Sequence, residues 1–346
     1  MIFPMGLLGR FKRRCIRIRQ KARCCGIILS YHRIADVNND PFQLAVAPRR
    51  FREHMEVLRR LTKPVVLNSF ASRRRSLGNR WRCAVTFDDG YQDVAEYALP
   101  ILNAYDIPAT IFVSSGCVQT GSEFWWDRLQ RCLLTPGRLH WSQLEALDRK
   151  LFSSFHDSLI QAERYSQEDF LRYGSWTWKC PIQPTSRHVL FCRMYQHLQS
   201  QSAAVRDRLI DILFQICPDA PHTVDAHAMS VDELQALSGN PLIEIGSHTL
   251  NHVMLSFLDE QEQLLEVQEG KRTVERLIQR PVASFSYPHG AYTPATLNIA
   301  RSAGVEIACT TRQTFVSRNN TRLELPRVSP EAWSGEQLEQ WLRQVL

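Results

Sequence analysis

The sequence predicts an α/β fold built from parallel β/α units and interrupted by a mostly helical insertion. Short apolar runs rich in β-branched residues recur along the chain, several are followed by helix-like segments, and one long stretch lacks this rhythm. At 346 residues the chain is long enough for one large barrel or for two smaller domains. With 44% hydrophobic and 22% charged residues and no internal repeat, its composition is that of a globular protein.

The expected strands are apolar runs bounded by turn residues. They lie at 26–31, 64–67, 83–87, 109–113, 242–246, 282–287, 305–309 and 323–328.

Helices are expected between these strands. Apolar residues at 51, 55, 58 and 61 form a helical stripe, and 94–105 has the pattern of a second helix. Ser230 begins a capping box, so a short helix starts there and ends near Gly239. A long amphipathic helix is expected from Asp259 to Leu277, and Gly304 stands where a helix C-cap belongs.

The insertion at about 117–229 divides a barrel region that runs from 26 to 346. It contains helical stretches such as 204–216 and a group of tryptophans, namely Trp125, Trp126, Trp141, Trp176 and Trp178. Packing of these rings inside the insertion is the favoured interpretation, and a platform that stacks on sugars is the alternative.

Residues 1–25 form a basic tail that carries much of the net charge of +7, and Arg73–Arg75 form a second basic run. Apolar residues between the tail's arginines allow a basic amphipathic helix on anionic lipid, whereas a solvated tail is the alternative. No pattern of aromatic and basic residues accompanies this charge, so nucleic acid is not an expected partner.

The ten cysteines show no C-x-x-C spacing, which is typical of free core thiols in a reducing compartment. No apolar run approaches the roughly 20 residues of a membrane span. The apolar segment 24–31 follows basic residues but has no small-residue cleavage site, so we expect a buried strand rather than a signal peptide. We therefore expect a cytoplasmic protein, with peripheral contact at the inner face of the membrane through the basic tail.

Polar residues able to do chemistry follow several expected strands directly. Asp88 and Asp89 follow 83–87, His248 and His252 follow 242–246, and His32 follows 26–31. In a barrel of parallel strands such ends converge on one face. The Asp-Asp-Gly pattern alone is also explained by a surface turn. The H-x-x-x-H pattern alone can arise by chance in a chain with eleven histidines.

Together, two imidazoles and one carboxylate form a three-ligand set that leaves a position open for water, as in a catalytic zinc site. His248 and His252 would lie one turn apart if their segment were helical. Asp89 would be the third ligand, and Asp88 the general base that takes a proton from the activated water.

Three segments resemble, in order, the first three motifs of the polysaccharide deacetylases, carbohydrate esterase family 4. They are residues 86–93 (TFDDGYQD), 246–252 (GSHTLNH) and 285–290 (FSYPHG). The resemblance covers roughly 26–116 and 240–330 and implies a distorted (β/α)7-type barrel. It implies Asp88 as base, Zn²⁺ ahead of Co²⁺ or Ni²⁺ bound by Asp89, His248 and His252, and substrate contacts at Tyr91, Tyr287 and Pro288.

This chain departs from the family pattern at two places. Ser286 and His289 stand where the third motif usually has Arg and Tyr, so the arginine that orients the base is missing, while the His289 backbone N–H still suits an oxyanion. Leu325-Pro-Arg327 stands where Leu-x-His should supply the general acid. Residues 29–34 resemble the start of a permuted branch that includes poly-N-acetylglucosamine deacetylases, which implies His32 as the acid, with His289 competing.

The expected function is metal-dependent removal of an N-acetyl group from an amino sugar or glycan precursor during surface polysaccharide biosynthesis. Two alternatives are a catalytically idle barrel that binds glycan and a metallohydrolase that acts on a different amide or ester.

Overall fold

The computed structural model describes residues 24–71, 81–140, 155–220, 226–331 and 333–345. The basic run within the N-terminal tail, Arg73–Arg75 and Trp141 lie outside these residues, so their predicted roles stay predictions.

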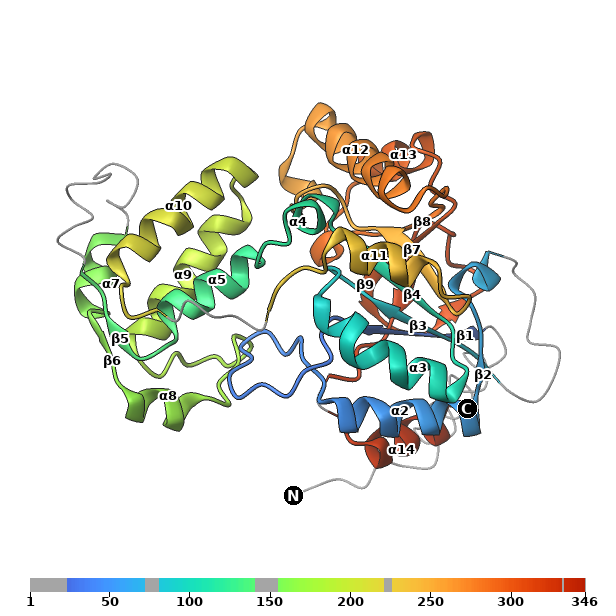
Figure 1. The fold of residues 1–346 in the computed structure, drawn as a ribbon, viewed down its shortest axis with the longest axis horizontal. Helices are drawn as coiled ribbons and strands as arrows, with labels where there is room; N and C mark the ends of the chain where they lie inside the picture. Colours follow the sequence, from blue (N-terminus) through green and yellow to red (C-terminus); the bar gives the residue numbers. More distant parts are fainter. Residues whose placement is uncertain (1–23, 72–80, 141–154, 221–225, 332, 346) are drawn as a thin grey trace, which may run out of the picture.

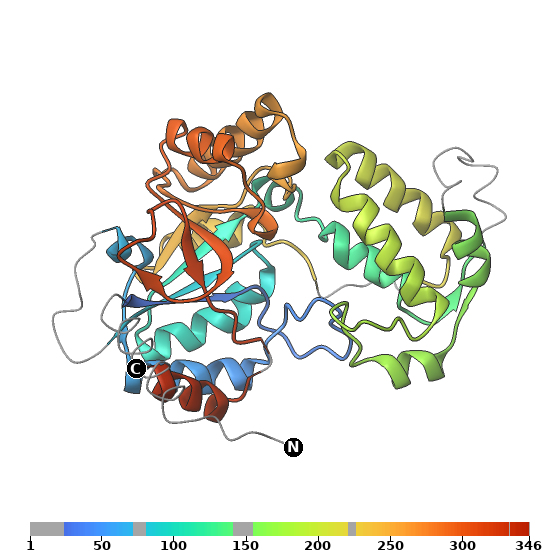
Figure 2. The same ribbon diagram turned by 180° about the vertical axis from the view of Figure 1, so that it is seen from behind.

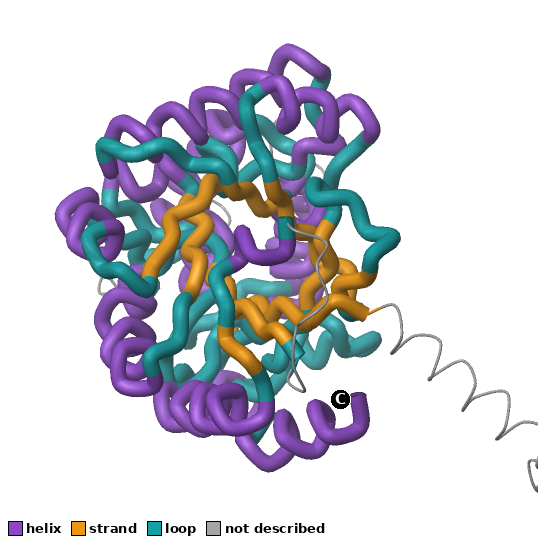
Figure 3. The backbone as a smooth tube through the Cα atoms, turned by 90° about the vertical axis from the view of Figure 1, so that its right-hand side faces the viewer, coloured by secondary structure: helices purple, strands orange, loops and turns teal. Residues whose placement is uncertain are grey.

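A ring of parallel strands forms the centre of the larger part of the molecule, and Figure 3 shows it nearly end-on. The strands pair in the order β10-β1-β3-β4-β7-β8-β9-β11. The parallel members are β1 (Cys24–Tyr31), β3 (Arg82–Phe87), β4 (Ala109–Val113), β7 (Ile243–Ser247), β8 (Ser284–Ser286), β9 (Ile307–Gln313) and β11 (Leu325–Arg327). The short β10 (Val316–Ser317) is antiparallel to β1, and β2 (Lys63–Pro64) pairs with β3. The predicted (β/α)7-type barrel is thus confirmed.

The barrel closes where β11 returns to β1. The Val328 N–H donates to the carbonyl of Ile28 at 2.8 Å, and the Ser30 N–H donates to the carbonyl of Val328 at 2.9 Å. Since both strands run in the same direction, the residues that follow their carboxyl ends share one mouth.

Helices cover the outside of the ring (Figures 1 and 2). They are α2 (Pro48–Leu61), α3 (Leu99–Tyr105), α4 (Ser115–Thr120), α11 (Val231–Ser238), α12 (Glu260–Ile278), α13 (Pro294–Ser302) and α14 (Gly335–Val345). Short helical turns are η1 (Leu67–Phe70), η5 (Leu255–Phe257) and η6 (Pro288–Gly290). Ser230 forms the cap of a capping box and Gly304 has φ +77° after α13, both as predicted, and Asp259 forms a second capping box at the start of α12.

The helix predicted at 94–105 begins as a π-helix, η2 (Val94–Ala98), before α3. Pro100 lies in the first turn of α3 and has no N–H to donate to the carbonyl four residues back. The backbone therefore pairs Leu99 N–H with the carbonyl of Val94, five residues back. The predicted strand 64–67 is also shorter than expected, because the chain turns into η1 at Leu67.

The insertion folds as a helical lobe beside the barrel (Figure 1). We call the part from α5 to α10 the insertion lobe. It comprises α5 (Trp125–Leu133), β5 (Gly137–Arg138), α7 (His156–Gln161), β6 (Arg164–Tyr165), α8 (Gln167–Tyr173), α9 (Ser186–Gln199) and α10 (Ala203–Ile216). Its buried Arg187 donates to backbone carbonyls of Leu133, Gly137 and Glu163 at 3.0–3.1 Å and ties these elements together.

All cysteines whose side chains are described are free thiols, and Cys83 and Cys309 are buried in β3 and β9 as expected. Among the described residues, no helix is both long and apolar enough to cross a membrane.

Candidate metal centre

Asp89, His248 and His252 meet at the mouth of the barrel. Asp89 follows β3 with a positive φ of 71°, which turns its carboxylate toward the loop after β7. Its Oδ1 atom lies 3.3 Å from His248 Nε2 and 3.1 Å from His252 Nε2. All three side chains are buried, and one ligand atom from each lies within 4.8 Å of the others. The structure therefore brings together the three residues predicted as metal ligands.

The two histidines are presented by a loop and not by a helix, which corrects the expectation of a helical turn. Residues 248–254 have no helical assignment, and Thr249 and His252 both have positive φ, 66° and 49°. The hydroxyl of Thr249 accepts the backbone N–H of His252 at 3.0 Å. These left-handed residues fold the chain back so that both imidazoles reach Asp89.

Three side chains from other elements hold this ligand loop (residues 248–252). Glu266 on α12 accepts the backbone N–H groups of Leu250 and Asn251 at 3.1 and 2.9 Å. Arg206 on α10 donates to the carbonyls of Asn251 and His252 at 2.9 and 3.4 Å. The ring of Trp126 on α5 packs on His252, with 4.4 Å between ring centres. Two of the three supports come from the insertion lobe.

The chemistry of the donor atoms fits a divalent ion. His248 Nδ1 lies 2.7 Å from the carbonyl of Ser286, which can only accept, so Nδ1 carries the proton. Nε2 of His248 therefore faces the carboxylate of Asp89; burial alone would lower the pKa of His248, but Asp89 raises it. Burial alone would raise the pKa of Asp89, but His252 and His248 lower it well below its ordinary value. A buried carboxylate that faces two imidazole nitrogens has the donor atoms to hold a cation.

Asp88 lies beside this cluster and is held by an arginine. Nη1 and Nη2 of Arg327 donate to Oδ1 and Oδ2 of Asp88 at 2.7 and 2.6 Å, and Ser286 Oγ donates to Oδ2 at 3.2 Å. Burial would raise the pKa of Asp88, but Arg327 outweighs it and the pKa is lowered. The prediction that an arginine orienting the base is missing was wrong, because β11 supplies one from the position where the family has Leu-x-His.

Ser286 makes room for an arginine that comes from β11 and not from the third motif. Its hydroxyl accepts from Arg327 Nη2 at 2.9 Å while it donates to Asp88, so a small residue on β8 leaves room for the guanidinium from β11. Arg327 Nε and Nη1 also donate to the Thr310 carbonyl and the Thr86 hydroxyl, both at 3.1 Å. Arg327 is 1% exposed and bonded through all three nitrogens, so it is a fixed part of the barrel mouth.

A pocket of about 560 Å³ opens over Asp88, between the barrel mouth and the insertion lobe. His32, Asp88, His289 and Arg327 line it from the barrel, and Trp178, Lys179, Tyr195 and Gln199 line it from the insertion. Both candidates for the general acid thus reach the pocket that contains the predicted base. His289 also lies with its ring centre 4.9 Å from that of His252, and its pKa is lowered well below the usual value by burial and by His252.

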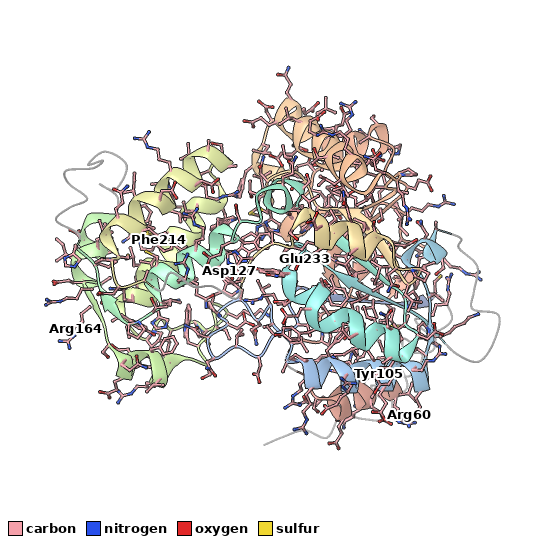
Figure 4. All side chains as sticks on the ribbon, in the orientation of Figure 1. Arg60, Tyr105, Asp127, Arg164, Phe214 and Glu233 are labelled. Atoms are coloured by element: carbon pink, nitrogen blue, oxygen red, sulfur yellow. The ribbon has the colours of Figure 1, made fainter. Side chains whose placement is uncertain are left out.

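Tyr91, Tyr287 and Pro288, the predicted substrate contacts, are buried and do not line this pocket. The Tyr91 hydroxyl donates to Asp127 at 2.6 Å and accepts from Trp126 Nε1 at 2.7 Å; Figure 4 labels Asp127 where α5 meets the barrel. Tyr287 packs between Phe285 and Tyr292. In the structure these three side chains make packing and hydrogen-bond contacts away from the pocket, and their role as substrate contacts stays a prediction.

The barrel holds a buried carboxylate and two imidazoles beside an aspartate that an arginine fixes. This fold and this candidate site are typical of metal-dependent hydrolases. The family model described as polysaccharide deacetylase matches residues 78–145 and 215–308. The two matched segments cover just under half of the chain and carry a polysaccharide deacetylase domain; proteins of that family are hydrolases acting on carbon–nitrogen bonds. The described residues between them, 155–214, belong to the insertion lobe.

A curated relative is a putative polysaccharide deacetylase, YxkH, of Bacillus subtilis (strain 168). It is 28% identical over 102 residues, which span 30% of this chain and 36% of the relative. This chain therefore matches about a third of that protein's length.

Two solved structures share the fold. The Streptococcus pyogenes deacetylase PplD in complex with acetate has a TM-score of 0.53 and 17% identity, over 92% of this chain and 98% of that one. IcaB from Ammonifex degensii has a TM-score of 0.55 and 17% identity, over 92% and 97% of the two chains. Both comparisons extend across the insertion lobe as well as the barrel.

Proposed function

We propose that this chain is a metal-dependent N-deacetylase that acts on an N-acetylated amino sugar in a surface polysaccharide or its precursor. One observation carries the proposal: an ionised, arginine-held Asp88 lies beside the Asp89, His248 and His252 cluster and faces a pocket of about 560 Å³. Family membership supplies the reaction class, deacetylation of a carbohydrate.

A divalent ion held by Asp89, His248 and His252, Zn²⁺ by its preference for such N and O donors, would lower the pKa of a bound water and polarise the acetyl carbonyl. Asp88 accepts the proton of the attacking water, and Arg327 keeps that carboxylate ionised and aimed. The His289 backbone N–H, at the tight turn of η6, stabilises the negative oxygen that forms.

His32 is the proposed general acid. It follows β1, lines the pocket with Asp88 and donates a proton to the departing sugar nitrogen, so that acetate and a free amine result. His289 is the weaker candidate because its ring packs against that of His252.

An idle barrel that only binds glycan is the alternative from a different class, and it rested on the missing arginine and the missing Leu-x-His. Arg327 makes the contact expected of the arginine, so the first of these two grounds for inactivity is removed. A metallohydrolase that acts on another amide or on an ester has the same site residues and differs only in the substrate that the pocket accepts.

The test is acetate release from N-acetylglucosamine and its β-linked oligomers by protein loaded with Zn²⁺. Asp88→Asn removes the base and keeps the shape of the side chain, so we expect the rate to fall about 10³-fold while Zn²⁺ still binds. Asp232→Asn, an exposed carboxylate at the start of α11, is the matched control and should keep the wild-type rate.

His32→Gln should lower the rate for the amide by about 10²-fold and spare an activated aryl acetate, whose leaving group needs no acid. The proposal fails if Asp88→Asn matches the wild-type rate, or if the wild-type protein binds glycan and Zn²⁺ but releases no acetate.

A further inference from the structure

Trp178 differs from the other described tryptophans of the insertion. Trp125, Trp126 and Trp176 are 5%, 4% and 7% exposed and pack inside the lobe or against the ligand loop, as the favoured interpretation predicts. Trp178 is 40% exposed, and of these four rings only Trp178 lines the pocket that contains Asp88. An aromatic ring that is partly exposed and lines a pocket offers an apolar face to a ligand bound there.

Neighbouring residues hold Trp178 in place from both sides of the pocket. Its ring centre lies 6.2 Å from Phe42, on the loop after β1, and 5.7 Å from Tyr195 on α9. Its backbone N–H donates to the Pro41 carbonyl at 3.0 Å. The next residue, Lys179, forms an ion pair of 2.7 Å with Glu331, which follows β11. The ring is therefore ordered before any ligand binds, which lowers the entropy cost of binding.

The pocket is larger than one acetylated sugar needs. At ~30 Å³ per water-sized group, its volume corresponds to about nineteen such groups, whereas one N-acetylhexosamine has about fifteen non-hydrogen atoms that are more closely packed. Amide side chains of Gln43, Gln199 and Gln313 also line it, and each amide can both donate to and accept from a hydroxyl. The lining thus combines one open aromatic face with neutral hydrogen-bonding groups.

We propose that Trp178 forms a second sugar subsite, in which its ring stacks on the pyranose next to the sugar whose acetyl group is removed. A pyranose presents C–H groups on its faces and hydroxyls at its edge, so it matches an aromatic face flanked by amides. The protein is accordingly selective for substrates of at least two sugar units. This inference rests on the proposed deacetylase function.

The experiment compares N-acetylglucosamine with its β-linked dimer and trimer as substrates of the Zn²⁺-loaded full chain. For Trp178→Ala we expect KM for the trimer to rise roughly tenfold, because burying one sugar face on an indole contributes about 1.4 kcal/mol, with kcat nearly unchanged. KM for the monosaccharide stays at the wild-type value. Trp178→Phe keeps an aromatic face and recovers most of the loss.

Tyr97→Ala removes an aromatic ring of similar exposure, 42%, that does not line the pocket, and serves as the matched control. Binding of the deacetylated trimer, followed by tryptophan fluorescence without turnover, should weaken by the same factor in Trp178→Ala. Equal loss for monosaccharide and trimer would place the reacting sugar on Trp178 and overturn the second subsite, as would an unchanged KM for the trimer. Absence of acetate release by the wild-type protein with every sugar is a different result, since it removes the proposed function itself.

Discussion

The two halves of the candidate site are supported by different parts of the molecule. Among the described residues, the Asp88 carboxylate is held by barrel residues, Arg327 from β11 and Ser286 from β8. The ligand loop with His248 and His252 depends on side chains outside the barrel strands, and two of these, Arg206 and Trp126, belong to the insertion lobe. The base is thus a property of the barrel alone, whereas the geometry of the metal ligands depends on the barrel and the lobe together.

This difference teaches how an insertion can support a candidate metal site without supplying one of its ligands. The apolar side chains of the lobe join one hydrophobic cluster with those of the barrel, and its α5 and α10 also reach the ligand loop. Substitutions in the barrel should therefore affect the base and the folding stability, and substitutions at the lobe contacts should affect metal affinity. Three substitutions, taken from the largest expected effect to the smallest, distinguish contacts within the barrel from contacts made by the lobe.

Arg327→Met should be the most damaging change. It leaves the buried carboxylate of Asp88 without its partner, and breaking a buried ion pair in this way costs about 3–5 kcal/mol. The pKa of Asp88, which Arg327 now holds low against the effect of burial, should rise. Urea unfolding measures the loss of stability, and Zn²⁺ titration should show an affinity near that of the wild type.

Asp88→Asn combined with Arg327→Met is the control for that prediction, since the double variant carries no unpaired charge at this position. It should be more stable than Arg327→Met alone. A single variant within about 0.5 kcal/mol of the wild type would contradict the idea that the pair is a fixed element of the barrel mouth.

Arg206→Met should weaken Zn²⁺ binding about 10- to 100-fold, as expected when a side chain that orients a metal ligand is removed. Calorimetric titration of the metal-free protein measures this directly. Arg208→Met changes an exposed arginine on the same helix and is the matched control. Equal Zn²⁺ affinity in the two variants would show that the lobe does not position the ligand loop.

Asp127→Asn should change the pH dependence of stability without a large change in the site. Burial raises the pKa of Asp127 from 3.8 to about 8, so between these values the folded protein keeps a proton that the unfolded chain has lost. Unfolding then releases a proton, and stability falls as pH rises through this window, by at most about 1.4 kcal/mol per pH unit.

Asparagine still accepts the Tyr91 hydroxyl but cannot ionise. Urea unfolding of both proteins at pH 5 and pH 7.5 should show a smaller difference for Asp127→Asn. Parallel pH profiles of the two proteins would mean that Asp127 does not titrate with a raised pKa in the folded chain.

The sequence predicted the barrel well because strand patterning is local. The strand at 109–113 has the predicted bounds, the capping box at Ser230 begins a helix as expected, and the long helix begins after Asp259. The meeting of Asp89, His248 and His252 was also predictable, because the loops after two parallel strands carry them.

The remaining features depend on contacts between distant segments. Arg327 was interpreted as the absence of an acid, although a charged residue at the end of the strand that closes the barrel beside β1 was a signal for a partner of Asp88. The loop geometry at Thr249 and His252 depends on Glu266 and Arg206, whose positions no local pattern indicates. Likewise, only the three-dimensional arrangement separates Trp178 from the tryptophans that pack in the lobe.

The Lys179–Glu331 ion pair has a consequence for engineering and for divergence within such proteins. It joins the wall of the pocket formed by the insertion to the chain segment that follows Arg327, while Arg206 joins the same lobe to His252. If the lobe were exchanged for that of a relative, in order to alter the length of sugar chain that the pocket prefers, the exchange would also remove an anchor of the ligand loop. A graft that succeeds must bring its own arginine to the carbonyls of Asn251 and His252.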